Sequence, residues 1–342
     1  MVGCLNFSLV EYYQRRLQVL YRSCGLESRL VDLEDGTIMK CWIPQRNKER
    51  AISMATSNQK PPVVLLHAFG SSANSWNYQV KPFSKFFDLY IPDLVFFGDS
   101  TTSRTERSEF FQADCVVKML QQLSVPKYSV VGTSYGGFVA YRIAHMYPDS
   151  VDKLVISSSG VIMDSSSNQR LIDKFKVNSI KDILLPTTVE GMRRVAGLAF
   201  HRQLPFPIPR FIMEDYLEHI VIKNYKEREE LTDSLVLGKD ESPPLPIVPQ
   251  DVLIMWGEFD EIFNVQLAHQ LKEHIGDKAK VVVMKNCAHV PQVEKASEYN
   301  KHVLSFLTNG QSDVKASSPG RRFPYRIGLP ALDKTDKITY CS

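Results

Sequence analysis

The 342-residue sequence lacks the marks of several protein classes. No apolar run approaches the roughly 18–20 residues that a membrane span needs. The N-terminus lacks the cationic start, apolar block and cleavage site of a signal peptide, and Val2 excludes myristoylation. The six cysteines are scattered, without a C-x-x-C pair or metal-ligand spacing, as is typical of reduced thiols in the cytosol. We therefore expect a cytoplasmic protein that uses no metal or other cofactor.

The net charge is low, and the excess of basic residues is confined to one end of the chain. The formal charge is +3, and the six basic and three acidic residues of 310–342 account for all of it. Because the rest of the chain has no positive excess, we expect no nucleic-acid partner. Residues 310–342 are also rich in Ser, Pro, Gly and charge, which predicts a disordered tail.

Apolar strand patterns alternate with helical patterns over 28–160 and again over 247–309. An Asp-Gly pair at 35–36 separates two strand patterns and predicts a hairpin. The alternation predicts an α/β core with a mostly parallel, doubly wound sheet of about eight strands. The strands are expected at 28–33, 37–42, 63–66, 89–91, 128–131, 153–157, 251–255 and 280–284.

Two segments fall outside this alternation. Residues 1–27 have an amphipathic helical pattern, which we expect to pack on the body; contact with a membrane surface is the alternative. Residues 161–246 are helical, with a capping box formed by Thr187 and Glu190, and predict an inserted cap over the sheet.

The strongest chemical signal is the run G-T-S-Y-G-G from Gly132 to Gly137, which lies between an apolar strand and a helical stretch. A G-x-S-x-G run in that setting indicates a sharp turn that exposes a nucleophilic serine. We expect strained dihedrals at Ser134, and bulky side chains at 132 and 136 would collide across the turn. Ser134 is therefore the predicted nucleophile.

A serine hydroxyl needs a base and an acid to become reactive. His289 follows the last predicted strand, and Asp260 follows the strand before it. We predict that His289 transfers the proton and that Asp260 fixes the tautomer of the imidazole. Glu258, Glu261 and Asp164 are rival acids.

Two further features of the site are predicted. The backbone N–H groups of Phe69, in the loop L-L-H-A-F-G, and of Tyr135 form the oxyanion hole. His67 holds that loop by hydrogen bonds. Among the apolar residues of the cap, Phe206 and Ile208 are the ones expected to face a substrate pocket.

These motifs, with P-D-L-V-F-F-G-D-S at 92–100, W-G-E-F-D at 256–260 and A-H-V-P at 288–291, resemble those of the α/β-hydrolase superfamily over about residues 28–308. The chain looks most like a plant group called meta-cleavage-hydrolase-like or monoacylglycerol-lipase-like. The resemblance implies the α/β-hydrolase fold with an inserted cap. The sequence differs from the family pattern at Ala68, where the family usually has Gly, and at Val290, where bacterial meta-cleavage enzymes typically carry Trp.

Three functions fit these residues. The leading one is a serine esterase or lipase that cleaves a small-molecule carboxylic ester of small or medium apolar size through an acyl-enzyme. The second is a carbon–carbon bond hydrolase of the meta-cleavage type with the same triad. The third is a ligand-binding receptor on a hydrolase scaffold.

Overall fold

The computed structural model describes residues 8–45, 60–202, 208–235 and 244–310. Strands from both predicted core segments join one nine-stranded sheet in the order β1-β2-β4-β3-β6-β7-β8-β9, with β5 paired to β2. The strands from β4 to β9 in this order are parallel, whereas β1, β2 and β5 join them by antiparallel pairing. Their bounds are β1 Leu26–Asp32, β2 Thr37–Pro44, β3 Pro62–Leu66, β4 Asp88–Pro92, β5 Thr101–Thr102, β6 Tyr128–Thr133, β7 Val151–Ser157, β8 Asp251–Gly257 and β9 Ala279–Met284.

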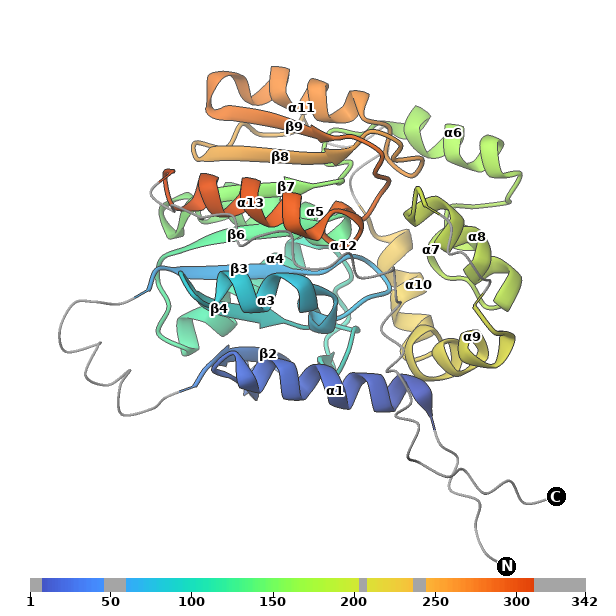
Figure 1. The fold of residues 1–342 in the computed structure, drawn as a ribbon, viewed down its shortest axis with the longest axis horizontal. Helices are drawn as coiled ribbons and strands as arrows, with labels where there is room; N and C mark the ends of the chain where they lie inside the picture. Colours follow the sequence, from blue (N-terminus) through green and yellow to red (C-terminus); the bar gives the residue numbers. More distant parts are fainter. Residues whose placement is uncertain (1–7, 46–59, 203–207, 236–243, 311–342) are drawn as a thin grey trace, which may run out of the picture.

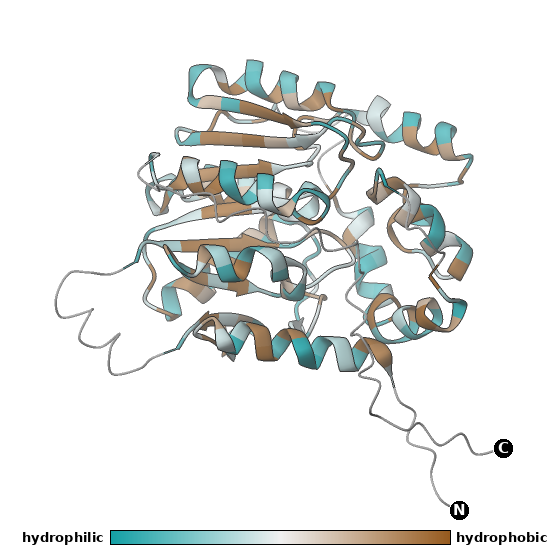
Figure 2. Cartoon of the chain, viewed as in Figure 1, coloured by the Kyte–Doolittle hydropathy of each residue, from teal (hydrophilic) through white to brown (hydrophobic). Residues whose placement is uncertain are grey.

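Helices cover both faces of the sheet (Figure 1). On one face lie α4 (Glu109–Gln122), α5 (Tyr135–Met146) and α11 (Gln266–Ile275), which pack on the larger apolar cluster. On the other face lie α3 (Asn77–Phe83) and α13 (Ala296–Leu307), which pack on a second cluster around Trp76. The brown strands in Figure 2 lie between these helices, so the parallel strands are buried on both faces.

The N-terminal helix α1 (Leu9–Ser23) packs on the body of the protein. Ser8 caps it by accepting a hydrogen bond from the N–H of Glu11, and its inward face buries Leu17 and Tyr21. The helix contacts α3, α9 and β1. None of the helices in the described ranges is long and apolar enough to cross a membrane.

The chain between β7 and β8 forms a helical layer at the carboxyl ends of the parallel strands (Figure 1). Its helices are α6 Ser165–Phe175, α7 Lys181–Leu184, α8 Val189–Ala199, α9 Arg210–Tyr216, η3 Leu217–Val221 and α10 Tyr225–Asp233. The capping prediction was off by one residue: α8 is capped by Thr188, whose hydroxyl accepts from the N–H of Gly191 at 3.1 Å. Glu190 is then at N2, so it is not the reciprocal partner that a capping box requires.

Candidate active site

Ser134 stands at the junction of β6 and α5. Its backbone has φ 51° and ψ −119°, the strained conformation that the sequence predicts for this position. The turn is held by the Ser134 N–H, which donates to the Ser157 carbonyl at 2.9 Å, and by its own carbonyl, which accepts from the Ser159 hydroxyl at 2.6 Å. The Ser134 side chain remains partly exposed at the end of the sheet.

Two glycines make this turn sterically feasible, as expected. A Cβ on Gly132 would lie 2.2 Å from the Gly136 carbonyl oxygen, and a Cβ on Gly136 would lie 2.3 Å from the Leu66 carbonyl oxygen. Real Cβ atoms essentially never come so close to backbone atoms. The start of α5 therefore rests directly against the end of β3, which places the β3 loop beside Ser134.

A continuous hydrogen-bond chain links the three predicted triad residues. His289 Nε2 lies 3.0 Å from Ser134 Oγ, and His289 Nδ1 lies 2.9 Å from Asp260 Oδ2. His289 and Asp260 are buried, at 6% exposure each. With Nδ1 donating to the carboxylate, Nε2 is free to accept the serine proton, so the geometry suits base-assisted attack by a hydroxyl.

Asp260 is fixed by the loop that follows it. Its Oδ1 accepts from the N–H groups of Ile262 at 3.0 Å and Phe263 at 2.9 Å. The Phe263 ring lies 5.5 Å from the His289 ring, centroid to centroid, and the Trp256 indole donates to the Phe263 carbonyl at 2.8 Å. Sequence reasoning missed this supporting role of Phe263, because no motif extends past Asp260.

The rival acids serve elsewhere. Glu258 pairs with Lys285 at 2.8 Å, and Glu261 pairs with Lys174 at 3.4 Å. Asp164 caps α6 by accepting from the N–H of Ser167 at 2.9 Å. Of the candidate acids, the structure brings Asp260 to the imidazole.

The side chains of the two residues predicted to supply the oxyanion donors are in contact. Tyr135 is the first residue of α5, so its N–H has no acceptor within the helix. The rings of Phe69 and Tyr135 meet edge to face with centroids 5.6 Å apart, and the Phe97 ring packs on both. The positive end of the α5 dipole also points at this position. Whether the two N–H groups bind an oxyanion stays a prediction.

His67 anchors the loop that carries Phe69. Its Nε2 accepts from the Leu94 N–H at 2.9 Å, so its Nδ1 carries the proton and donates to the Ala68 carbonyl at 2.8 Å. The ring is fully buried, and burial lowers the pKa of His67, which keeps it neutral. The positive φ of the loop falls at Gly70, and Ala68 avoids it, as its side chain requires.

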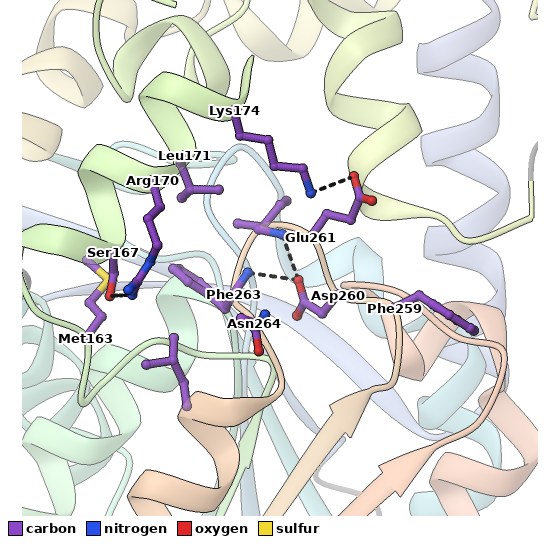
Figure 3. Close-up of a pocket in the computed structure, with 12 residues that line it drawn as sticks. Met163, Ser167, Arg170, Leu171, Lys174, Phe259, Asp260, Glu261, Phe263 and Asn264 are labelled. Carbon is purple, nitrogen blue, oxygen red and sulfur yellow. Dashed lines mark hydrogen bonds and ion pairs between the residues drawn. The ribbon is translucent and has the colours of Figure 1, made fainter. Parts of the chain in front are cut away.

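A cavity of about 340 Å³ lies between α6 and the loop after β8 (Figure 3). Met163, Leu171 and Phe263 give it apolar walls, and its charged lining is mixed, with Arg170 and Lys174 of α6 facing Asp260 and Glu261 of the loop. Asp260 lines it, so the cavity reaches the acid side of the triad. Within the described residues, no group of three or more His, Cys, Asp or Glu is arranged to hold a metal ion.

The pocket prediction named Phe206 and Ile208. Phe206 lies outside the described residues. Ile208 packs against a cluster within the cap formed by Val189, Met213, Leu217 and Val221, and it does not line the cavity beside Asp260.

Known proteins resemble this chain in both sequence and structure. A family model described as alpha/beta hydrolase fold matches residues 61–205. Monoacylglycerol lipase ABHD6 of Mus musculus is 26% identical over 271 residues, 73% of this chain and 76% of the relative. A 2-hydroxy-6-oxo-6-phenylhexa-2,4-dienoate hydrolase of Burkholderia cepacia is 23% identical over 272 residues, 76% of this chain and 92% of the relative.

Two solved structures show the same fold. The 2-hydroxy-6-oxo-6-phenylhexa-2,4-dienoate hydrolase of Rhodococcus sp. strain RHA1 superposes with a TM-score of 0.66 at 20% identity, covering 83% of this chain and 99% of its own. Carboxylesterase CesB of Bacillus subtilis gives a TM-score of 0.64 at 18% identity, covering 88% of this chain and 98% of its own. The protein thus has the α/β-hydrolase fold. Its sequence is similar to those of hydrolases that include monoacylglycerol lipases and 2-hydroxy-6-oxo-6-phenylhexa-2,4-dienoate hydrolases. Plant origin stays a prediction.

Proposed function

We propose that this α/β-hydrolase is a serine esterase that cleaves carboxylic esters of small or medium apolar substrates through an acyl-enzyme. The observation that carries the proposal is the unbroken hydrogen-bond chain from Ser134 through His289 to Asp260. In the first step, Ser134 Oγ bonds to the ester carbonyl carbon while His289 Nε2 takes its proton. His289 then gives that proton to the departing alcohol, and Asp260 stabilises the imidazolium between the two transfers.

The charge that develops on the carbonyl oxygen is assigned to the backbone N–H groups of Phe69 and Tyr135. Water then attacks the acyl-enzyme, with His289 as the base, and releases the acid and free Ser134. The apolar character of the substrate is inferred from the partly exposed Phe69 and from the apolar wall that Met163, Leu171 and Phe263 give to the cavity beside Asp260. Relatives whose names denote a monoacylglycerol lipase and a carboxylesterase support ester chemistry.

The second candidate is carbon–carbon bond hydrolysis next to a ketone by the same triad. It is favoured by the relatives whose names denote dienoate hydrolases. Bacterial meta-cleavage enzymes typically carry Trp after the histidine, and this chain has Val290 there, which favours ester hydrolysis instead.

A direct comparison of substrates tests the proposal. Purified protein is assayed with aryl esters of graded acyl length and with a vinylogous 1,5-diketone. Steady ester turnover with no diketone cleavage is expected. Faster diketone cleavage would replace the proposal by the second candidate. A single turnover with no further product formation would instead indicate a ligand-binding receptor.

Where the protein acts is also a proposal. We infer a cytoplasmic location from the scattered cysteines. The α1 helix also exposes Val19 at 61%, which would allow peripheral contact with a membrane. Sedimentation with anionic lipid vesicles tests that alternative: binding of the wild type that Val19→Glu abolishes would establish the contact, and no binding of the wild type would refute it.

A further inference from the structure

Glu294 joins two parts of the molecule that the sequence places far apart. It ends α12 (Pro291–Glu294), the short helix that begins two residues after His289. Its Oε2 accepts from the Ala288 N–H at 2.7 Å. Its Oε1 accepts from the N–H groups of His201 at 2.9 Å and Arg202 at 3.3 Å, in the cap. One carboxylate thus connects the histidine loop to the cap.

The donors explain why a carboxylate is suited to this place. All three are backbone N–H groups, and the Cys287 thiol also lies against the carboxylate: burial and then the charge of Glu294 raise the pKa of that thiol. A carboxylate has two oxygens and accepts at both, and hydrogen bonds to an ionised acceptor are about twice as strong as neutral ones. An amide side chain could accept from the donors on one side through its oxygen, but its NH₂ group would then face the N–H donors on the other side.

The same cap segment also touches the loop of the catalytic acid. The His201 ring stacks on the Phe259 ring with centroids 4.3 Å apart and planes 9° apart. Phe259 directly precedes Asp260, and its N–H donates to the Cys287 carbonyl at 2.8 Å. The cap segment at 201–202 therefore contacts both loops that carry the histidine–aspartate pair.

We propose that Glu294 is a positioning residue that ties the cap to the His289 loop, so that the cap's placement sets the position of the imidazole. The proposal rests on the catalytic role proposed for His289. Proton transfer from Ser134 Oγ to His289 Nε2 takes place across a distance of 3.0 Å. A shift of about 1 Å at a reacting group can lower the rate on the order of 10²-fold.

The test is Glu294→Gln in the full-length protein, with Glu298→Gln as the matched control. Glu298 lies four residues further on, exposed in the first turn of α13. With an aryl ester, and well below the unfolding temperature of each variant, we expect kcat of Glu294→Gln to fall about 10- to 100-fold. We expect KM to stay within about threefold, because no substrate contact is removed.

A second measurement does not depend on activity. Amide hydrogen exchange is expected to become faster in Glu294→Gln both at Ala288 and at His201–Arg202, and to stay unchanged at these sites in Glu298→Gln. A kcat within twofold of wild type, an equal loss in the control, or faster exchange on one side alone would overturn the proposal. A wild type that turns over no ester would instead refute the proposed function, and the exchange measurement would still report whether Glu294 joins the two segments.

Discussion

Replacing Asp260 by Asn tests the role of the acid in detail. Two backbone N–H groups, from Ile262 and Phe263, point at the Oδ1 position and demand an acceptor there. The amide oxygen of the substituted side chain must therefore take that position, which turns its NH₂ group toward His289 Nδ1. That nitrogen, 2.9 Å from Oδ2 in the wild type, must then become an acceptor.

The consequence is a change of tautomer. With the proton moved to Nε2, His289 presents an N–H to Ser134 Oγ and can no longer take its proton. The analogous swap in a serine protease triad lowers kcat on the order of 10⁴-fold, which corresponds to ~5.5 kcal/mol in the activation free energy. We expect a loss of that order here.

The assay follows aryl-ester hydrolysis by the variant and by Glu261→Gln, which alters an exposed acid one residue away. The midpoint temperature of Asp260→Asn should stay close to that of the wild type, since both backbone hydrogen bonds to Oδ1 survive. A kcat within tenfold of wild type would refute the tautomer reasoning. A loss equalled by Glu261→Gln would do the same.

Three other predictions have defined outcomes. Gly136→Ala should lower the free energy of unfolding in urea by about 1–3 kcal/mol, because the added Cβ would meet backbone oxygens at the end of β3. Gly197→Ala in α8, where a Cβ meets open space, should instead raise it by up to ~1 kcal/mol. Equal effects of the two substitutions would contradict the packing argument. Burial would raise the pKa of Asp35, but hydrogen bonds from neighbouring side chains outweigh it and lower that pKa to about 2. The stability advantage of wild type over Asp35→Asn should therefore be full above about pH 4 and vanish as the pH falls toward 2; a constant difference would disprove it. A hydrogen bond to the backbone of residue 215 raises the pKa of His219, so an NMR titration should place it above 6.5, and the stability it contributes should be lost as the pH rises through the raised pKa.

Much of the fold was predictable because its signals are local. Apolar runs such as 63–66 and 128–131 gave strands, and the Asp35-Gly36 pair gave the hairpin between β1 and β2. The short α3 was missed, since Asn77–Phe83 carries Pro82 inside the helix and has no side-chain cap. The observed helix ends also differ from the predicted ones by a few residues, as at the start of α8, where two adjacent threonines compete as caps and Thr188 takes that position.

The site also contains features that the sequence predicts and features that it does not. Ser134, Asp260 and His289 follow strand ends, and a parallel sheet brings strand ends together, so their approach to hydrogen-bond distance was foreseeable. The contacts of Glu294 were not foreseeable, because they join residues 201–202 to residue 288 through backbone N–H groups that carry no sequence signal. Ile208 could not be placed either, since an apolar residue suits the cap's own cluster as well as a pocket.

The central claim is that Ser134 is the nucleophile. The most direct measurement is labelling with a fluorophosphonate probe, with the adduct located by mass spectrometry in the wild type and in Ser134→Ala. The account predicts a single adduct on the peptide that contains Ser134 and no labelling of the variant. Labelling that survives in Ser134→Ala, or an adduct on another residue in the wild type, would contradict it.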